Sequence, residues 1–516
     1  MSMYDKAIVA SGHRLVSSTA AALLREGGNA FDAMVGAGFA SAVVEPTLTS
    51  LGGGGLLIGH SQRYGQDLFF DFFVDTPGIG RPRIDQVDDF FPVTVRFSGS
   101  TQDFNIGCGS VAVPGTLKGL LHTHERLGKM GLADVVAPAI ELARSHRINE
   151  KQGHFLSLLH PIMTNHEQGR LLYEPGGIYK KAGDLLENAL CAEFLESIVS
   201  DNGEAFYRGE TAKAMDRDMR EAGGLLSRED LAAYEVVERS PLKVRYRDCE
   251  LLTAPEPSVG GTLIALSIGL LEKAGQYQGV WGDGNQLCRT VTLMQQVEKI
   301  RADGELNGDR LFSALDAAAG QRAVEQMRLF SRGTTHISIA DQDGNCAAMT
   351  CSNGEGSGYF APGTGIMLNN MMGEDDLHPG GFHSSPAGIR VGSMMSPSLL
   401  VKDGVVRLVI GSGGSKRIRT AISQVLNQVV DFNRDLGEAV DAPRLYWDGS
   451  VVQVEPGFSE EALDLLRGHA PLNLWNQCDV YFGGVHAVVP GNAGAGDPRR
   501  GGAVEVVDTP TVSRDS

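Results

Sequence analysis

The apolar residues near the start of the chain recur at helical spacing. Residues 13–25 place them on one face, and this segment stops at Gly27 and Gly28. Asn29 can then cap a second segment, which is apolar on all sides and ends before Pro46. We therefore predict two consecutive helices, of which the second is buried.

Strand-like segments come next and are followed by a long helical part. Four glycines at 52–55 lead into the apolar residues 56–58, and residues 68–74 form a second apolar run of strand length. Helical spacing begins near residue 113 and dominates from 150 to 330. We expect helices to make up most of this region.

After residue 332 the pattern changes to alternation. Residues 334–340 and 346–352 alternate on either side of a turn at 341–345, which predicts an antiparallel hairpin. A turn of this length would place Thr334 opposite Ser352 on one face of the hairpin. The other face carries the apolar side chains, and we expect it to be the buried one.

The remainder of the chain predicts further strands around one helix. Residues 399–401 and 405–410 predict a second hairpin, residues 417–430 an amphipathic helix, and residues 451–454 and 484–489 two more strands. The length of 516 residues alone would suggest about three domains. Because no internal repeat or flexible linker divides the chain, we expect one compact α/β unit instead.

Bulk composition excludes several kinds of partner. The formal net charge is −18, whereas proteins that bind nucleic acids need a basic face, so no nucleic-acid partner is expected. No apolar run is long enough to span a membrane, and the first residues lack the features of a secretory signal. The 7 cysteines lack metal-ligand spacing, which favours reduced thiols. We expect a cytoplasmic protein that uses no metal and no other cofactor.

Thr334 acquires a chemical role if the chain is cut before it. A threonine hydroxyl is a poor nucleophile unless a base takes its proton. Cleavage would give Thr334 a free α-amine with a pKa of about 7.7–8.0, which suits a general base at neutral pH. One residue would then supply nucleophile and base, and Ser352 could hold the hydroxyl in place. The alternative is that Thr-Thr-His at 334–336 is only the β-prone start of a strand.

The residues around Thr334 resemble the nucleophile motif of the γ-glutamyltransferases, a family of the N-terminal-nucleophile hydrolase superfamily. Each match is weak alone, but together they follow the family order along nearly the whole chain. The motif consists of Thr-Thr-His at 334–336, Ser338, Gly-Asn at 344–345, Thr350 and Ser352. Further matches lie at 26–30, 51–55, 113–115, 223–224, 230–231, 234, 257–261, 368–370, 395–397, 411–415, 442–444 and 497–499.

This resemblance implies a four-layer αββα sandwich and a chain that processes itself. Cleavage between Gly333 and Thr334 would convert a zymogen into a large fragment, residues 1–333, and a small fragment, residues 334–516, which stay intertwined. Thr334 would attack a small-molecule γ-glutamyl amide such as glutathione and pass the acyl group to water or to an amine. Two alternatives stay open: the same threonine chemistry on a non-glutamyl acyl amide, and an unprocessed homologue that binds without catalysis.

Gly413 and Gly414 match the paired glycines whose backbone N–H groups stabilise the oxyanion in this family. The helix predicted just after them would add the positive end of its dipole. Two other interpretations of residues 411–416 are a phosphate-binding loop, whose GxxxxGK[ST] spacing is absent, and a purely structural turn. The segment is also one residue shorter than its family counterpart.

The residues that would bind a glutamyl group match the family only in part. Ser393 matches the first of two serines that bind the α-carboxylate, whereas Met394 replaces the second. Phe73 replaces the arginine that anchors this carboxylate, which should weaken glutamate recognition about ten- to a hundredfold. Arg390 matches another basic family position and could substitute for it, or could lie at the surface.

The predicted amine-binding side of the pocket is closer to the family. Glu374 matches the family acid that binds the substrate amine. Asn353 matches, with a small shift in position, the family asparagine near the second hydroxyl. Glu374 could equally be a solvated loop charge. Met371 replaces a glutamine, and with Phe73 and Met394 it favours a less polar acyl chain. These replacements leave the predicted chemistry intact and alter the predicted pocket.

Overall fold

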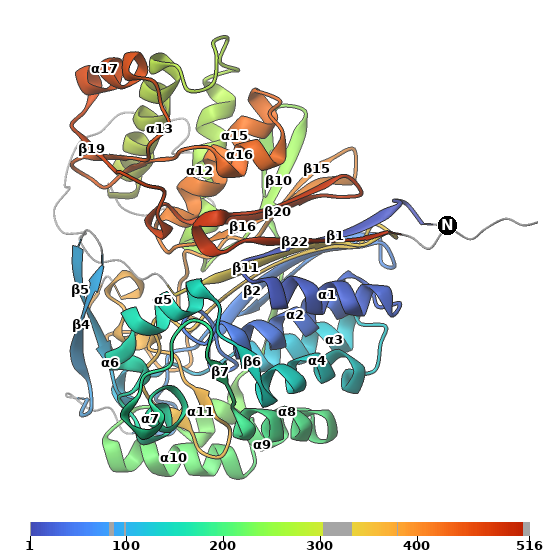
Figure 1. Ribbon diagram of the computed structural model, residues 1–516, viewed down its shortest axis with the longest axis vertical. Helices are drawn as coiled ribbons and strands as arrows, with labels where there is room; N and C mark the ends of the chain where they lie inside the picture. Colours follow the sequence, from blue (N-terminus) through green and yellow to red (C-terminus); the bar gives the residue numbers. More distant parts are fainter. Residues whose placement is uncertain (1, 82–86, 98–99, 303–332, 379, 509–516) are drawn as a thin grey trace, which may run out of the picture.

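The computed structural model describes residues 2–81, 87–97, 100–302, 333–378 and 380–508. Two β-sheets lie face to face across the middle of the molecule, and helices cover the outer face of each sheet (Figure 1). The layers therefore run helix, sheet, sheet, helix, and the predicted αββα sandwich is confirmed.

The first sheet brings together strands from both ends and the middle of the chain, and every pair in it is antiparallel. The predicted hairpin forms its centre. In spatial order the seven strands are β22 (Ala503–Asp508), β1 (Lys6–Ser11), β11 (Thr335–Ala340), β12 (Cys346–Ser352), β2 (Gly54–Ser61), β3 (Gln66–Phe72) and β8 (Val237–Arg239).

The second sheet is also antiparallel and contains the second predicted hairpin. Its strands come from the C-terminal third and from one short segment near residue 250. In spatial order the six strands are β21 (Ala493–Gly496), β20 (Gly484–Val489), β16 (Val405–Gly413), β15 (Ser398–Lys402), β10 (Cys249–Thr253) and β9 (Leu242–Tyr246).

Helices from the N-terminal part pack on the first sheet, and helices from the second half pack on the second sheet (Figure 1). The first group comprises α1 (Arg14–Arg25), α2 (Ala30–Val44), α3 (Thr116–Leu127) and α4 (Leu132–Arg144). The second group comprises α12 (Val259–Lys273), α15 (Arg417–Asp431) and α16 (Leu436–Asp441).

Smaller elements surround this sandwich. The remaining helices are α5 (Glu150–Leu158), α6 (His160–Met163), α7 (Glu167–Tyr173), α8 (Ala189–Asp201), α9 (Glu204–Tyr207), α10 (Glu210–Ala222), α11 (Arg228–Ala233), α13 (Gly284–Ala302) and α17 (Glu460–His469). The remaining strands are β4 (Phe91–Phe97), β5 (Ser100–Ile106), β6 (His146–Arg147), β7 (Leu185–Leu186), β13 (Phe360–Ala361), β14 (Ile366–Met367), β17 (Leu445–Trp447), β18 (Val452–Val454) and β19 (Leu472–Leu474).

The two helices predicted at the start of the chain are confirmed. Asn29 caps α2: its side chain accepts the backbone N–H groups of Phe31 and Asp32, and the Asp32 carboxylate accepts the N–H of Asn29 in return. Nearly every residue of α2 is buried, because the helix packs against the first sheet and against α1, α3 and α4.

The predicted register of the central hairpin is confirmed, but the predicted burial of only one face is wrong. Thr335 pairs with Cys351 and His336 with Thr350, which leaves Thr334 beside Ser352 at the open end. The face with His336 is as buried as the apolar one, because the second sheet covers it. The His336 ring satisfies its nitrogens there with the hydroxyls of Thr350 (2.8 Å) and Ser338 (2.9 Å).

The prediction of a mainly helical region from 150 to 330 missed the strands β8, β9 and β10. These strands are short, and their positions are fixed by partners far away in sequence, such as β3 and β15. The last part of this region, residues 303–330, lies outside the described residues.

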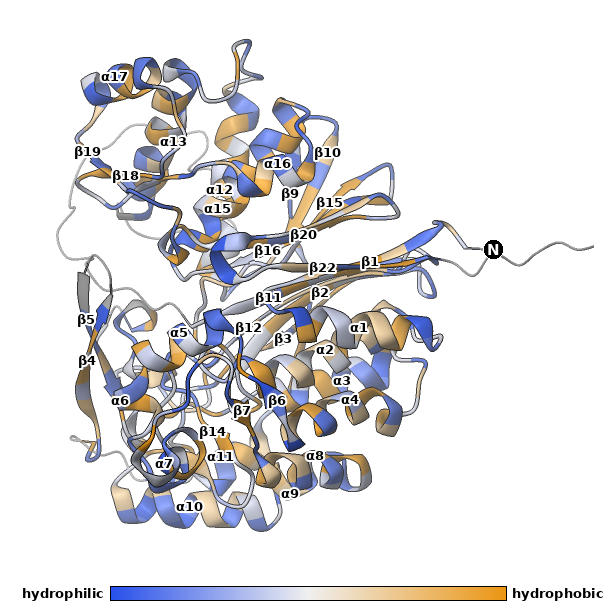
Figure 2. Ribbon diagram, viewed as in Figure 1, coloured by the Kyte–Doolittle hydropathy of each residue, from blue (hydrophilic) through white to orange (hydrophobic). Residues whose placement is uncertain are grey.

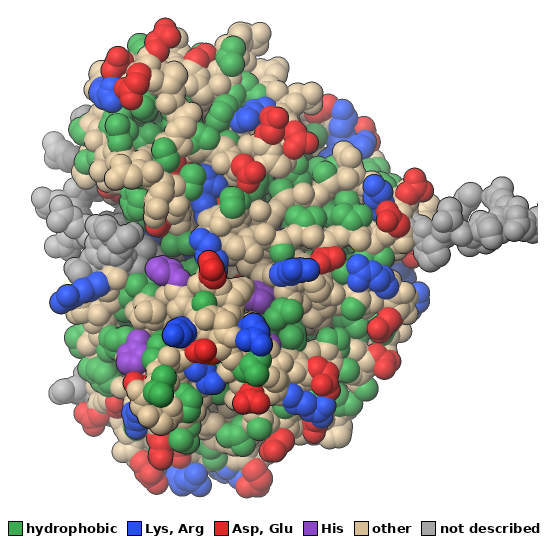
Figure 3. Space-filling view, in the orientation of Figure 1, with side chains coloured by type: hydrophobic (Ala, Val, Ile, Leu, Met, Phe, Trp, Pro, Cys, Tyr) green, Lys and Arg blue, Asp and Glu red, His purple; other side chains and the backbone are tan. Residues whose placement is uncertain are grey.

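Two hydrophobic cores hold the layers together. One lies between the first sheet and α1 to α4, and the other fills the space between the sheets and under α12 and α15. Figure 2 shows β10 and β15 largely in hydrophobic colours, as expected for strands covered on both faces. On the face drawn in Figure 3, acidic and basic side chains are interspersed. Among the described residues, no helix combines the length and the apolar character needed to cross a membrane.

Candidate active site at Thr334

The open end of the central hairpin brings the predicted nucleophile next to the hydroxyl predicted to face it. Thr334 Oγ1 donates to Ser352 Oγ at 3.5 Å, and Ser352 Oγ in turn donates to the carbonyl oxygen of Gly333. The N–H of Gly354 donates to Ser352 Oγ at 3.1 Å and fixes its position. One hydroxyl therefore touches both the nucleophile and the peptide bond that precedes it.

Residue 333 has no room for a side chain. A Cβ atom placed on Gly333 would lie 1.7 Å from the carbonyl oxygen of Gly354, closer than any real contact. The N–H of Gly333 donates to Glu355 Oε1 at 3.2 Å. The residue before Thr334 is thus held by its backbone alone.

Gly413 lies beside Thr334, and Gly414 follows it in the chain. Gly413 ends β16, and a Cβ on it would be 2.4 Å from the carbonyl oxygen of Thr334. Gly414 has a φ of 122°, which a side chain would strain, and it packs against Gly483. Because α15 begins at Arg417, this backbone stands at the positive end of a helix dipole. The predicted role of their backbone N–H groups in stabilising an oxyanion stays a prediction.

Arg500 is a residue of this site that the sequence did not reveal. Its Nη1 donates to the carbonyl oxygen of Thr334 at 2.9 Å. Burial lowers the pKa of its guanidinium to about 10, so the group keeps its charge at neutral pH. The signal available in sequence was its position next to the family motif at 497–499, which does not say where the side chain points.

Glu45 is a second residue that the sequence did not reveal. It follows α2 and is fully buried, and its Oε2 accepts the hydroxyl proton of Thr335 at 3.0 Å. Its other oxygen has no hydrogen-bond partner among the described residues. Burial raises the pKa of this carboxyl to about 7, although Thr335 and Arg500 favour the charged form. A buried acid therefore lies against the residue that follows Thr334.

Asn353 and Glu374 lie next to the hydroxyl pair. Asn353 follows Ser352 in the chain, is buried, and its side-chain amide has no hydrogen-bond partner among the described residues. A Cβ on Gly354 would be 2.3 Å from Glu374 Oε1, so this carboxylate packs against the loop after Ser352. Glu374 is 7% exposed, so its alternative interpretation as a solvated loop charge is wrong.

Ser393 is fixed beside the start of α12. Its hydroxyl accepts the N–H of Met395 at 3.0 Å, and its carbonyl oxygen accepts the N–H of Gly260 at 3.1 Å and the hydroxyl of Ser258 at 3.2 Å. These contacts join Ser393 to α12 and to its own loop. Its predicted contact with a substrate carboxylate stays a prediction.

Arg390 is engaged with carboxylates of the protein. Its side chain is 9% exposed, so the alternative of a surface position is wrong. The guanidinium donates to Asp71 at 2.7 Å, to Asp75 at 2.6 Å and to the carbonyl oxygen of Glu235 at 2.8 Å. These contacts, with one to the carbonyl oxygen of Asp71, occupy four of the five N–H donors of the guanidinium.

Phe73 occupies the position of the missing family arginine. Its side chain is buried in the core between the sheets and packs against Gly54, which pairs with Ser352 across β2 and β12. An apolar side chain therefore lies behind the end of the hairpin that carries Ser352.

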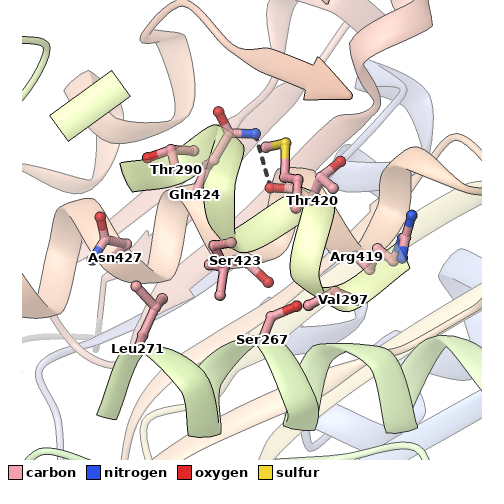
Figure 4. A pocket seen from close by; sticks show the side chains of 11 residues that line it. Ser267, Leu271, Thr290, Val297, Arg419, Thr420, Ser423, Gln424 and Asn427 are labelled. Atoms are coloured by element: carbon pink, nitrogen blue, oxygen red, sulfur yellow. Dashed lines mark hydrogen bonds between the residues drawn. The ribbon is translucent and has the colours of Figure 1, made fainter. Parts of the chain in front are cut away.

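A well-formed pocket elsewhere contains none of the predicted site residues. It lies between α12, α13 and α15, where Ser267, Ser423, Gln424 and Asn427 are among the residues that line it (Figure 4). In the described part of the chain, no group of three or more His, Cys, Asp or Glu residues is arranged to hold a metal ion.

Comparison with known proteins finds similarity along almost the entire chain. A family model described as gamma-glutamyltranspeptidase matches residues 16–327 and 312–507. The glutathione hydrolase proenzyme of Escherichia coli (strain K12) is 32% identical over 501 residues, which cover 89% of this chain and 84% of the relative.

Two further proteins are similar over comparable lengths. The acylase ACY 1 proenzyme of Pseudomonas sp. (strain V22) is 31% identical over 90% of this chain and 87% of its own length. The crystal structure of cephalosporin acylase from Bacillus halodurans superimposes with a TM-score of 0.82 at 23% identity, over 97% of this chain and 96% of the other. This structural likeness supports the sandwich fold.

Proposed function

We propose a mechanism and a substrate class for this chain, which belongs to the gamma-glutamyltranspeptidase family and is an enzyme of that kind. The proposed enzyme cleaves itself between Gly333 and Thr334 and then uses Thr334 to cleave γ-glutamyl amides. The observation that carries the proposal is the position of the Ser352 hydroxyl, which contacts both Thr334 Oγ1 and the Gly333 carbonyl oxygen.

In the proposed maturation, Thr334 Oγ1 attacks the carbonyl carbon of Gly333. The C–N bond breaks as the nitrogen of Thr334 takes up a proton, which leaves an ester between the two residues. Water then hydrolyses the ester, giving a carboxylate on Gly333 and a free α-amine on Thr334. Only glycine fits before the cut, because the carbonyl oxygen of Gly354 leaves no space for a Cβ there.

The arrangement of strands supports two fragments that stay together. In the first sheet, β1 from the large fragment lies between β22 and β11 of the small one, and β12 pairs with β2. In the second sheet, β15 of the small fragment pairs with β10 of the large one. Residues 1–333 and 334–516 would thus share both sheets and both cores after cleavage.

In the proposed mature enzyme, the α-amine of Thr334 takes the proton of its own hydroxyl. The hydroxyl oxygen attacks the amide carbonyl of the substrate, and backbone N–H groups at Gly413 and Gly414 stabilise the oxyanion. The leaving amine receives the proton, and the acyl-enzyme passes its acyl group to water or to an amine.

N-terminal sequencing of the purified protein tests this proposal directly. We expect two sequences, one from the start of the chain and one that begins Thr-Thr-His at residue 334. Intact-mass analysis should give two masses that add up to the precursor plus one water. A protein that is active while it gives only the first sequence would contradict the mechanism.

The proposed substrate class differs from that of the family in one respect, the binding of the α-carboxylate. Glu374 lies where an amine could be bound, whereas Phe73 and the engaged Arg390 leave the α-carboxylate without its family anchor. We propose that the enzyme accepts γ-glutamyl amides but depends little on their α-carboxylate.

A pair of substrates measures this dependence. We expect kcat/KM for 4-aminobutyryl anilide, which lacks the carboxylate, to lie within about tenfold of that for γ-glutamyl anilide, because a charge-assisted contact worth about 1.5–3 kcal/mol is missing. Glutaryl anilide, which lacks the amine instead, serves as the control and should react more slowly than both. If kcat/KM for 4-aminobutyryl anilide were more than about a hundredfold below that for γ-glutamyl anilide, another cation would have to replace the arginine.

A further inference from the structure

Glu355 is a buried carboxylate at the bond that is proposed to be cut. Its Oε1 accepts the N–H of Gly333 at 3.2 Å, and its own N–H donates to Asn370 Oδ1 at 3.0 Å. It lies close enough to the guanidinium of Arg500 for its charge to raise the pKa of that group, against the larger lowering by burial. Neither a local pattern nor the family resemblance assigned a role to this residue.

Three side chains hold the backbone on either side of the Gly333–Thr334 bond. Glu355 accepts the N–H of Gly333, Ser352 donates to the carbonyl oxygen of the same residue, and Arg500 donates to the carbonyl oxygen of Thr334. The oxygen of Gly354 closes the remaining side, because it leaves no space for a Cβ on residue 333. Gly333 is thereby fixed at both its N–H and its carbonyl oxygen.

Fixing residue 333 matters because the attack comes from its immediate neighbour. The carbonyl carbon of Gly333 must be presented to Thr334 Oγ1 at a narrow range of angles, and a displacement of about 1 Å can cost on the order of a hundredfold in rate. Ser352 alone fixes one atom of the peptide group and still allows rotation. A second contact on the other side of Cα removes this freedom.

We propose that Glu355 is a positioning residue for self-cleavage, which holds Gly333 by its N–H while Thr334 attacks. The inference rests on the proposed function, since it concerns the maturation of the same site. The role requires a hydrogen-bond acceptor at the right distance, and a negative charge alone would not supply it.

Two conservative substitutions separate these requirements. Glu355→Gln keeps an acceptor oxygen at the same reach and loses the charge, whereas Glu355→Asp keeps the charge and withdraws the acceptor by one methylene. We expect Glu355→Gln to cleave within about threefold of the wild-type rate and Glu355→Asp to cleave about a hundredfold more slowly. The full-length chain would be made by cell-free synthesis, and its conversion into two fragments followed on gels.

Asp230→Asn provides a matched control. Asp230 is also a buried carboxylate that accepts backbone N–H groups, those of Gly78 and Ile79, but it belongs to the capping box of α11 and not to the site around Thr334. We expect its substitution to leave the cleavage rate unchanged. Thermal unfolding of both Glu355 variants, measured in a Thr334→Ala background that stays uncut, should match that of Thr334→Ala alone.

The outcomes distinguish the two proposals. A wild-type chain that never cleaves overturns the proposed function and this inference together. A wild-type chain that cleaves, with Glu355→Asp as fast as wild type or Glu355→Gln slower than Glu355→Asp, overturns the role of Glu355 alone. Slowing by Asp230→Asn to the same degree would also overturn it, because the effect would then reflect general destabilisation.

Discussion

Replacing Thr334 with alanine is expected to leave the chain at full length and to lower kcat/KM by about 10⁴-fold or more. In the proposed mechanism, the variant lacks the hydroxyl that attacks Gly333, and after forced cleavage it would also lack the oxygen that attacks the substrate. Gel electrophoresis of the purified variant and hydrolysis of γ-glutamyl anilide measure the two effects separately.

Thr334→Ser is the matched control, because it keeps the hydroxyl and loses only a methyl group. We expect it to yield two fragments, more slowly than the wild type, and to keep measurable activity. A Thr334→Ala chain that is cut at the same bond and remains active would show that another residue is the nucleophile. The two variants together test the hydroxyl itself, since both leave the contacts of Ser352 with Gly333 in place.

The hairpin that carries Thr334 could be predicted because its signals are local. Alternation of apolar and polar residues fixes the faces of β11 and β12, and a turn at 341–345 fixes their register. Asp341 sets this turn, since its carboxylate accepts the N–H groups of Asp343 at 3.0 Å and Asn345 at 2.8 Å. Once the register is known, Ser352 has to lie beside Thr334.

The burial of both hairpin faces could not be predicted in the same way. His336, Ser338 and Thr350 are polar, and polar side chains usually indicate a solvated face. Here these side chains form hydrogen bonds with one another, so the second sheet can cover them without leaving polar groups unsatisfied. Only the three-dimensional structure shows that the polar groups of this face already have hydrogen-bond partners.

The other residues of the site were not predictable because their partners are far away in sequence. Glu45 meets Thr335 across 290 positions, and Arg500 meets Thr334 across 166. Arg390 was found by its place in the family, but its engagement with Asp71, 319 positions earlier, decides what it can still bind. The order of the strands in the sheets brings these residues together, and no local sequence pattern indicates that order.

Glu45 and Arg500 give the site a particular electrostatic setting. A buried acid with a pKa of about 7 and a buried guanidinium with a pKa of about 10 both lie within contact of residues 334–335. Burial and the contacts with Thr335 and Arg500 act on the Glu45 carboxyl in opposite directions, since burial raises its pKa and both contacts lower it.

Gly413→Ala is expected to lower the turnover of the cleaved enzyme by about 10²- to 10³-fold, the usual effect of losing an oxyanion contact. The new Cβ would lie 2.4 Å from the carbonyl oxygen of Thr334 and 3.1 Å from Nη1 of Arg500. Either the carbonyl or the backbone of residue 413 must move, and in the proposed mechanism both movements would separate the N–H groups from the reacting atoms. The fraction of cleaved chain would be measured first, so that kcat can be referred to mature enzyme.

Gly468→Ala is the control for this substitution. Gly468 lies in α17, and a Cβ added there would meet nothing within 4 Å. Because alanine favours a helix over glycine by roughly 1 kcal/mol, we expect unchanged activity and a slightly higher melting temperature. If Gly413→Ala instead keeps activity within about threefold of the wild type, the backbone at Gly413 does not stabilise the oxyanion, and the interpretation of this segment as a purely structural turn would be the correct one.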